Sequence, residues 1–156
     1  DQEKTDRTFK TFEGRRWSVP GDWATVEADG SLKLLGRGSQ VINTGGEKVF
    51  PEEVEEAIKR YPGVRDAAVV GAPDARFGER VCAVIDMAGE DLPTLTAISE
   101  HVRLHLAAYK APRDLVFAPI VRAANGKLDY KAVRAEVLAA LAGRSDVDLP
   151  ARMNDL

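Results

Sequence analysis

The sequence predicts a small α+β domain, in which helices pack on a small mixed β-sheet. Short apolar runs typical of strands are interspersed with stretches whose apolar residues recur at helical spacing. Glycine, proline and asparagine separate these stretches at turn positions. The 156 residues suffice for one domain with its own core and a fragment of another.

The first part of the chain carries a hairpin but no core pattern. Residues 1–20 are polar and are expected to be irregular. Residues 24–27 and 32–35 are strand-like and flank Asp29-Gly30, a dipeptide that readily adopts the positive φ angles of a tight turn. Residues 36–39 then break the pattern. We therefore expect one β-hairpin here, followed by a domain boundary.

The elements of the main domain are predicted from apolar runs, apolar stripes and end signals. In chain order, we expect a strand at 40–42, a loop with unusual backbone freedom at 43–46, a helix from Pro51, strands at 66–71 and 80–86, a helix capped by Thr94, a strand at 115–117, a turn at Asn125-Gly126, and a helix from about Tyr130 to Leu141. The stripes that should enter the core are Val54, Ala57, Ile58 and Tyr61 in the first helix, Leu95, Ile98, Val102 and Leu106 in the second, and Val133, Val137, Leu138 and Leu141 in the third.

Composition argues against several classes of protein. The net charge of −3 is unlike a domain with nucleic acid as an obligatory partner, because such domains usually carry a basic excess. No apolar run approaches the ~20 residues of a membrane span, and no secretory signal opens the sequence. Because the chain begins with Asp1 rather than Met, we expect it to be part of a longer polypeptide.

Cysteine and histidine give no sign of redox or metal chemistry. The single cysteine, Cys82, lies in an apolar run and is expected to be a reduced core thiol of an intracellular protein. His101 and His105 are four residues apart, a spacing that can hold a metal ion. There is no third ligand and no His-Glu-x-x-His arrangement, so we expect a solvated helix face and no metal site.

Four ordered motifs carry a family resemblance. They are Pro20-Gly21-Asp22, the stretch from Gly36 to Glu55, the stretch Tyr-Lys-Ala-Pro-Arg at 109–113, and the stretch Asn-Gly-Lys-Leu-Asp-Tyr at 125–130. Together they resemble the adenylate-forming superfamily, which includes acyl- and aryl-CoA synthetases, nonribosomal peptide adenylation domains and luciferases. The resemblance covers roughly residues 4–141. Within the superfamily, the residues of these motifs are most similar to those of bacterial fatty-acyl and steroid-acid CoA ligases.

The resemblance implies a division of the chain. Residues 1–37 would be the last hairpin of a large N-terminal adenylation domain, residues 38–142 the mobile C-terminal domain, and residues 143–156 a tail. Ser39 takes the hinge position, where the family usually has Asp or Lys. A hinge depends on dihedral freedom more than on charge, so a small hydroxylated residue remains suitable.

Three residues acquire roles in ATP chemistry from the resemblance. Asp22 and Arg37 would contact the ATP ribose, since a carboxylate can accept bonds from two hydroxyl groups. Lys127 would bridge the acyl carboxylate and the α-phosphate during the first half-reaction, as the catalytic cation. Without the resemblance, these residues would be an ordinary turn aspartate, a solvated arginine and an exposed turn lysine.

A second group is implied for CoA. Gly45, Gly46 and Glu47 resemble the segment lining the pantetheine tunnel, where glycine lets the backbone approach a thin thiol arm; a turn requiring positive φ is the other interpretation, and both can hold. Phe77, Tyr109 and Arg113 are at positions that contact CoA in related ligases. Packing between domains explains Phe77 and Tyr109 equally well.

The implied activity is that of an ATP-dependent, AMP-forming acyl-CoA ligase, with ATP and CoA as cosubstrates and Mg²⁺ held by ligands outside this chain. The implied partners are the missing large domain and a fatty, steroid or related carboxylic acid. The chain alone is expected to be inactive. We expect a cytoplasmic protein, with any peripheral membrane contact made through the missing part. The alternatives are an adenylation domain that loads a carrier protein and a non-catalytic interaction module.

Overall fold

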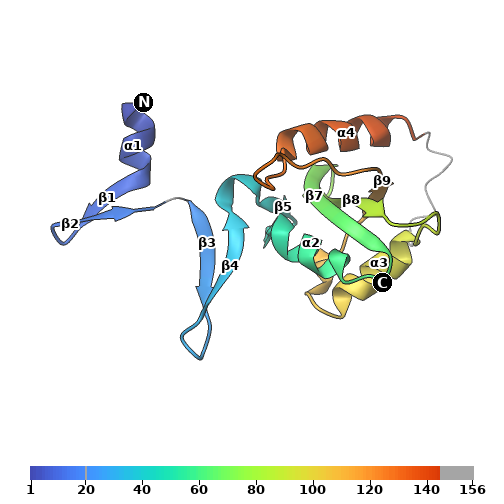
Figure 1. Ribbon diagram of the computed structural model, residues 1–156, viewed down its shortest axis with the longest axis horizontal. Helices are drawn as coiled ribbons and strands as arrows, with labels where there is room; N and C mark the ends of the chain where they lie inside the picture. Colours follow the sequence, from blue (N-terminus) through green and yellow to red (C-terminus); the bar gives the residue numbers. More distant parts are fainter. Residues whose placement is uncertain (20, 145–156) are drawn as a thin grey trace.

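The computed structural model describes residues 1–19 and 21–144, apart from the side chain of Arg37 (Figure 1). Predictions that concern Pro20 and residues 145–156 lie outside the described residues. In chain order, the elements are α1 (Gln2–Thr8), β1 (Phe9–Phe12), β2 (Arg15–Ser18), β3 (Asp22–Val26), β4 (Leu32–Arg37), the 3₁₀ turn η1 (Gly38–Gln40), β5 (Ile42–Thr44), β6 (Glu47–Val49), α2 (Pro51–Lys59), β7 (Val64–Asp74), β8 (Gly78–Met87), α3 (Leu95–Arg103), the 3₁₀ turn η2 (Ala108–Lys110), β9 (Asp114–Phe117) and α4 (Tyr130–Ala142).

The expectation that residues 1–20 are irregular is wrong. The Asp1 side chain accepts a hydrogen bond from the Lys4 N–H, at 3.2 Å, and so caps α1. β1 and β2 pair through a turn at Glu13-Gly14, where both residues have positive φ. No residue of α1 is buried, so local hydrogen bonds rather than core packing define this segment, and a search for core periodicity misses it.

The predicted hairpin is confirmed as β3 and β4. Val26 lies opposite Leu32, and Gly30 in the connection has φ +83°. Leu32 and Leu34 remain 69% and 75% exposed. Figure 1 shows this hairpin extending away from the unit of sheet and helices that follows it.

The main sheet is mixed, as predicted, and β8 lies at its centre. β7 pairs antiparallel with β8 along almost all of its length, from Val64 opposite Met87 to Asp74 opposite Gly78. The other edge of β8 is shared: β5 pairs with it at Gly78, and β9 runs parallel to it over residues 82–85. The parallel pairing requires a crossover connection, and α3 lies in that connection.

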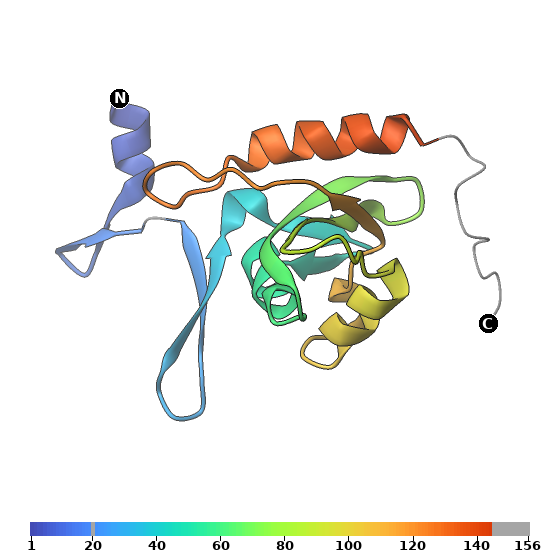
Figure 2. The same cartoon turned by 45° about the vertical axis from the view of Figure 1, so that its right-hand side comes forward.

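Helices cover both faces of the sheet (Figure 2). Side chains alternate along each strand, so Val69 and Ile85 pack with α2 and α3, whereas Val70 and Val84 pack with α4. All twelve predicted stripe residues pack in one of these two clusters. The predicted α+β fold is therefore confirmed, and so is the buried position of Cys82.

Two details near the start of the sheet correct the predictions. The strand expected at 40–42 is β5, which begins at Ile42 and continues through Thr44, because Gly38–Gln40 form a 3₁₀ turn instead. A second strand, β6, pairs with it and reduces the expected loop to Gly45-Gly46. β6 has only Val49 buried, so its pattern is too short to reveal a strand.

One of the two histidines differs from the prediction of a solvated face, whereas His105 is exposed as expected. A ring nitrogen of His101 lies 3.0 Å from the Ala57 carbonyl oxygen, and its ring meets Tyr61 edge-on at 5.3 Å. His101 therefore joins α3 to α2 rather than facing solvent, and His105 follows the end of α3. Within the described ranges, no three His, Cys, Asp or Glu residues gather as a metal site. No described helix has the length and apolar character to cross a membrane.

Candidate functional site

Residues 123–129, here called the lysine loop, form a tight turn that presents Lys127. The Ala123 N–H donates to the Lys127 carbonyl at 2.9 Å, and the Gly126 N–H donates to the Ala123 carbonyl at 2.8 Å. The Asn125 side chain accepts from the Lys127 N–H at 3.1 Å, and Gly126 has φ +76°. The predicted Asn-Gly turn is thus confirmed, with a backbone fixed by its own hydrogen bonds.

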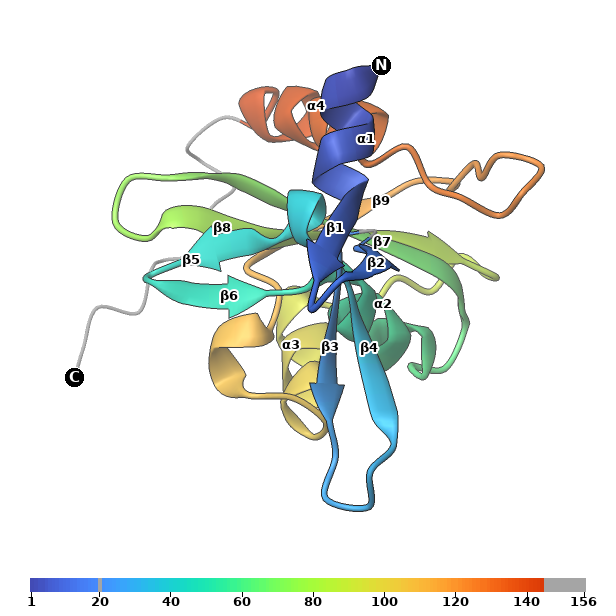
Figure 3. The same ribbon diagram turned by 90° about the vertical axis from the view of Figure 1, so that its left-hand side faces the viewer.

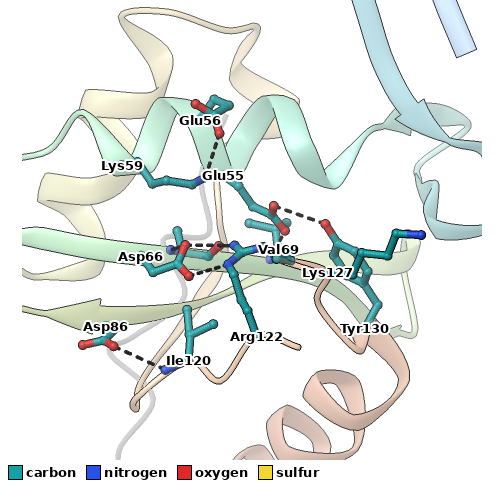
Figure 4. Close-up of polar contacts among 12 residues, drawn as sticks. Glu55, Glu56, Lys59, Asp66, Val69, Asp86, Ile120, Arg122, Lys127 and Tyr130 are labelled. Carbon is teal, nitrogen blue, oxygen red and sulfur yellow. Dashed lines mark hydrogen bonds and ion pairs between the residues drawn. The ribbon is translucent and has the colours of Figure 1, made fainter. Parts of the chain in front are cut away.

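Side chains hold both ends of the lysine loop (Figure 4). Before the loop, the Arg122 guanidinium donates to both Asp66 oxygens, at 2.6 and 2.9 Å, and holds the pKa of Asp66 below its ordinary value. After the loop, the Tyr130 hydroxyl donates to Glu55 at 3.2 Å. Burial raises the pKa of Glu55 to about 7 and also raises the pKa of Tyr130. The loop is therefore anchored to α2 and β7.

Lys127 itself is exposed. It borders an open surface pocket together with Gln40, Asn125 and Asp129. In Figure 4 its side chain points away from the buried polar contacts, and no ion pair engages its ammonium group within the described residues. A cation on a fixed loop, with its head group in solvent, can contact an anionic ligand.

The second candidate region is the Gly45-Gly46 turn, here called the glycine turn. Both residues have positive φ, +61° and +89°, and the Gly45 N–H donates to the Phe77 carbonyl at 2.8 Å. A β-carbon on Gly45 would lie 3.1 Å from the Phe77 ring, whereas one on Gly46 would meet nothing within 4 Å. Gly45 therefore packs on Phe77. The backbone of Gly46 faces open space, next to the exposed Glu47.

Arginine side chains surround Phe77. The Arg113 guanidinium lies 4.2 Å from the centre of the Phe77 ring, and that of Arg76 lies 5.1 Å from it. The structure thus brings Gly45, Phe77 and Arg113 together from three segments. Tyr109 lies in η2, 38% exposed, with the Lys110 ammonium 5.8 Å from its ring centre. The combination of an aromatic ring and guanidinium groups can bind a phosphorylated ligand.

The remaining predicted residues lie at the base of the β3–β4 hairpin. Asp22 and Arg37 are direct partners in that pair of strands. The side chain of Arg37 is outside the described part of the chain. The Gly38 N–H donates to the Gly21 carbonyl at 3.2 Å, so η1, which contains Ser39, begins directly beside Asp22.

Contacts that the sequence did not reveal hold this hairpin against the domain. The Trp23 ring lies 6.1 Å from that of Phe50, with the Lys48 ammonium 4.8 Å from the Trp23 ring centre. The Glu52 carboxylate lies so close to Gly36 that a β-carbon there would overlap it. Within the described residues, Oε2 of Glu52 is buried without a hydrogen-bond partner.

The lysine loop and the glycine turn lie on opposite sides of the domain. In Figure 3 the connection between β9 and α4 projects to one side, and the β5–β6 turn projects to the other. One fixed placement of this domain therefore cannot direct both loops at the same ligand atom.

Sequence reasoning missed Glu55, Asp66 and Arg122. Glu55 stands among acidic residues at the start of α2 and looks like a solvated helix residue, yet it is 4% exposed. Its partner Tyr130 is 75 positions away, and Arg122 is 56 positions from Asp66. Only their shared position on the folded sheet brings them together.

Comparison with known families and proteins gives a consistent result. The model of the AMP-binding enzyme C-terminal domain matches residues 53–127. A medium/long-chain-fatty-acid and 3-oxocholest-4-en-26-oate CoA ligase of Mycolicibacterium smegmatis is 53% identical over 132 residues, which are 84% of this chain and 24% of that protein. The chain thus spans about a quarter of the length of the curated relatives it matches.

Solved structures agree with this match. A fatty acyl-CoA synthetase of Mycobacterium tuberculosis superposes with a TM-score of 0.67 at 32% identity, over 88% of this chain and 27% of that one. An amide bond synthetase of Marinactinospora thermotolerans superposes with a TM-score of 0.75 at 34% identity, over 88% and 27% of the two chains.

Proposed function

We propose, on the premise that this chain belongs to the family of AMP-binding enzyme C-terminal domains, that it is the mobile part of an ATP-dependent acyl-CoA ligase. Residues 1–37 would end the large adenylation domain, residues 38–142 would form the domain that moves, and residues 143–156 would be a tail. The chain by itself would be inactive, because it spans only about a quarter of its relatives.

The observation that carries this proposal is the opposite placement of the lysine loop and the glycine turn. A two-step ligase needs each loop at the reacting acyl group, one after the other. Rotation about Ser39, in a short 3₁₀ turn directly after the hairpin, would exchange the two loops. Rotation would also separate Trp23 from Phe50, so the present contacts would belong to one of two arrangements.

In the first half-reaction, Lys127 would hold the carboxylate of the acid against the α-phosphate of ATP. Both groups are anionic and repel each other, and a preorganised ammonium group lowers the energy of their approach. The hydrogen bonds of the lysine loop support this role, because they fix the backbone from which the ammonium extends. Asp22, with Arg37, would contact the ribose from the base of the hairpin.

In the second half-reaction, the glycine turn would line the path of the CoA thiol arm. Gly46 leaves space for close approach to the backbone, with Gly45 and Glu47 on either side. Phe77 and Arg113 would contact the nucleotide end of CoA, by ring stacking and by an ion pair with phosphate. Tyr109, exposed in η2, would belong to the same surface.

The acid is proposed to be a fatty or steroid acid, from the substrates in the name of the M. smegmatis relative. The missing large domain would supply the acyl pocket and the ligands of the Mg²⁺ that accompanies ATP. A cytoplasmic location is part of the proposal, because ATP and CoA are available there.

The test is Lys127→Ala in the full-length protein. Acyl-dependent pyrophosphate exchange should fall by roughly 10²–10³, or about 3–4 kcal/mol, if the lysine acts like an oxyanion-hole donor. Thioester formation from synthetic acyl-adenylate and CoA should change little. In that step the domain would have rotated, and Lys127 would lie away from the reacting carbon.

Lys59→Ala is the matched control, since it removes a lysine from the last turn of α2, outside the pocket that Lys127 borders. It should leave both half-reactions unchanged. Equal losses in the two assays for Lys127→Ala would contradict the proposed division of labour. A full-length protein that forms no acyl-CoA from any fatty or steroid acid would refute the activity itself.

A further inference from the structure

A buried carboxylate joins helix α2 to the end of the lysine loop (Figure 4). Glu55 is 4% exposed, and each of its oxygens accepts one hydrogen bond. Oε1 accepts from the Val69 N–H on β7, at 2.9 Å, and Oε2 accepts from the Tyr130 hydroxyl, at 3.2 Å. Tyr130 is the first residue of α4 and follows Lys127 by three positions. The contact therefore fixes the point where the lysine loop enters its helix.

The other end of the loop is held by an independent contact on the same strand. Arg122 binds Asp66 with two hydrogen bonds, and it also donates to the Gly126 carbonyl at 3.3 Å, within the loop itself. Lys127 thus lies between two anchors that both rest on β7. Because the loop is closed by its own hydrogen bonds, we expect a change at either anchor to move it as a unit.

We propose that Glu55 and Tyr130 are positioning residues for the adenylation step, because their contact sets where Lys127 presents its ammonium group. This inference rests on the proposed function and deepens it. Neither residue touches the substrate in this scheme, and both act through the backbone of the lysine loop. A displacement on the order of 1 Å at a reacting group can cost about 10²-fold in rate.

The contact is specific rather than a general part of the core. Tyr130 lies on α4, which covers one face of the sheet, whereas Glu55 lies on α2, which covers the other. Their hydrogen bond passes around the β7 edge, beside the apolar packing of Leu128 and Tyr130 against the core. Charged groups near Glu55 are Arg122 from the loop side, Asp66 from β7 and Glu52 from its own helix.

The experiment compares Tyr130→Phe with Glu55→Gln in the full-length protein. Both changes keep the size of the side chain. Tyr130→Phe removes the hydroxyl group that donates the hydrogen bond, and Glu55→Gln replaces one carboxylate oxygen by an amide NH2 group. In Tyr130→Phe, kcat for pyrophosphate exchange should fall about 10-fold, as expected for a lost hydrogen bond of ordinary strength. In Glu55→Gln, whose amide group can still pair with the Tyr130 hydroxyl, kcat should fall by less. KM for the acid and for ATP is kept in both variants. Thioester formation from synthetic acyl-adenylate should remain as in the wild type.

Ser99→Ala is the control for general destabilisation. It removes another buried hydrogen bond, from Ser99 to the Pro112 carbonyl at 2.8 Å, on the α3 side of the domain. It should leave the ratio of the two half-reactions unchanged. If Tyr130→Phe and Glu55→Gln lower both half-reactions equally, or neither, the positioning role is wrong. The proposed function can still stand in that case, because Lys127→Ala tests it separately.

Discussion

Glu55→Gln should change how the stability of this chain depends on pH. Burial raises the pKa of Glu55 from 4.5 to about 7 in the folded chain. Between these two values, the folded state binds a proton that the unfolded state has released. Folding is therefore favoured at the acidic end, and stability is lost as pH rises through 7. The glutamine of the variant resembles the protonated carboxyl group and has no such dependence.

The magnitude follows from the two pKa values. Integrating the linkage relation from pH 5 to pH 8, with 4.5 for the unfolded and about 7 for the folded chain, gives roughly 2.5 kcal/mol. We subtract the free energy of unfolding of Glu55→Gln from that of the wild type. This difference should fall by roughly 2.5 kcal/mol as the pH rises from 5 to 8. Groups shared by the two proteins cancel in the difference.

Urea unfolding of both proteins at several pH values, followed by circular dichroism, measures this difference. Glu56→Gln is the matched control, because Glu56 is exposed on the same helix and pairs only with Lys59, at 2.7 Å, among the described residues. Its difference from the wild type should stay nearly constant. A constant difference for Glu55→Gln as well would show that Glu55 is not buried in solution, and the reasoning about its environment would fail.

Two further substitutions test the proposed hinge at Ser39 and the β4–α2 contact that precedes it. Gly36→Ala should destabilise the chain by roughly 3 kcal/mol, because φ is +118° there and the new β-carbon would overlap the Glu52 carboxylate. Gly30→Ala, at φ +83° in open space, should cost only about 1 kcal/mol, and equal losses in urea unfolding would mean that the β4–α2 contact is absent in solution. Ser39→Pro in the full-length protein fixes φ near −65° and should slow overall turnover, with thioester formation slowed most where the adenylating arrangement is trapped. Ser39→Ala keeps the backbone free and is the comparison; unchanged turnover in Ser39→Pro would place the pivot elsewhere.

Periodic patterns predicted the part of the fold that depends on burial. α2, α3, α4, β7 and β8 each repeat apolar residues over several turns or rungs, and every predicted core residue is buried in the core or packs against it. Among the exposed elements, only the β3–β4 hairpin was predicted, from its strand-like residues and its Asp29-Gly30 turn. α1 depends on its Asp1 cap, and β6 has a single buried residue, so neither was predicted.

In the candidate site, the sequence predicted only the conformations of individual loops, which depend on neighbouring residues. The Asn125-Gly126 turn and the positive φ of Gly45 and Gly46 follow from short sequences. Contacts between distant segments do not follow from short sequences. Nothing near Glu55 in the sequence indicates Tyr130, and nothing near Phe77 indicates the guanidinium of Arg113. Sheet pairing decides which polar groups meet, and one sequence does not encode that pairing locally.

The free edge of β7 explains a further property of the polar contacts beside the lysine loop. β7 ends the sheet and has six consecutive buried residues from Ala67 to Ala72, so its outward backbone groups could template the addition of a strand from another molecule. Side chains occupy those groups instead: Arg122 on the Ala67 carbonyl, Glu55 on the Val69 N–H, and Arg134 on the Gly71 carbonyl. Two of these contacts, those of Arg122 and Glu55, come from residues that also hold the lysine loop, so the same residues block this edge against pairing with another strand.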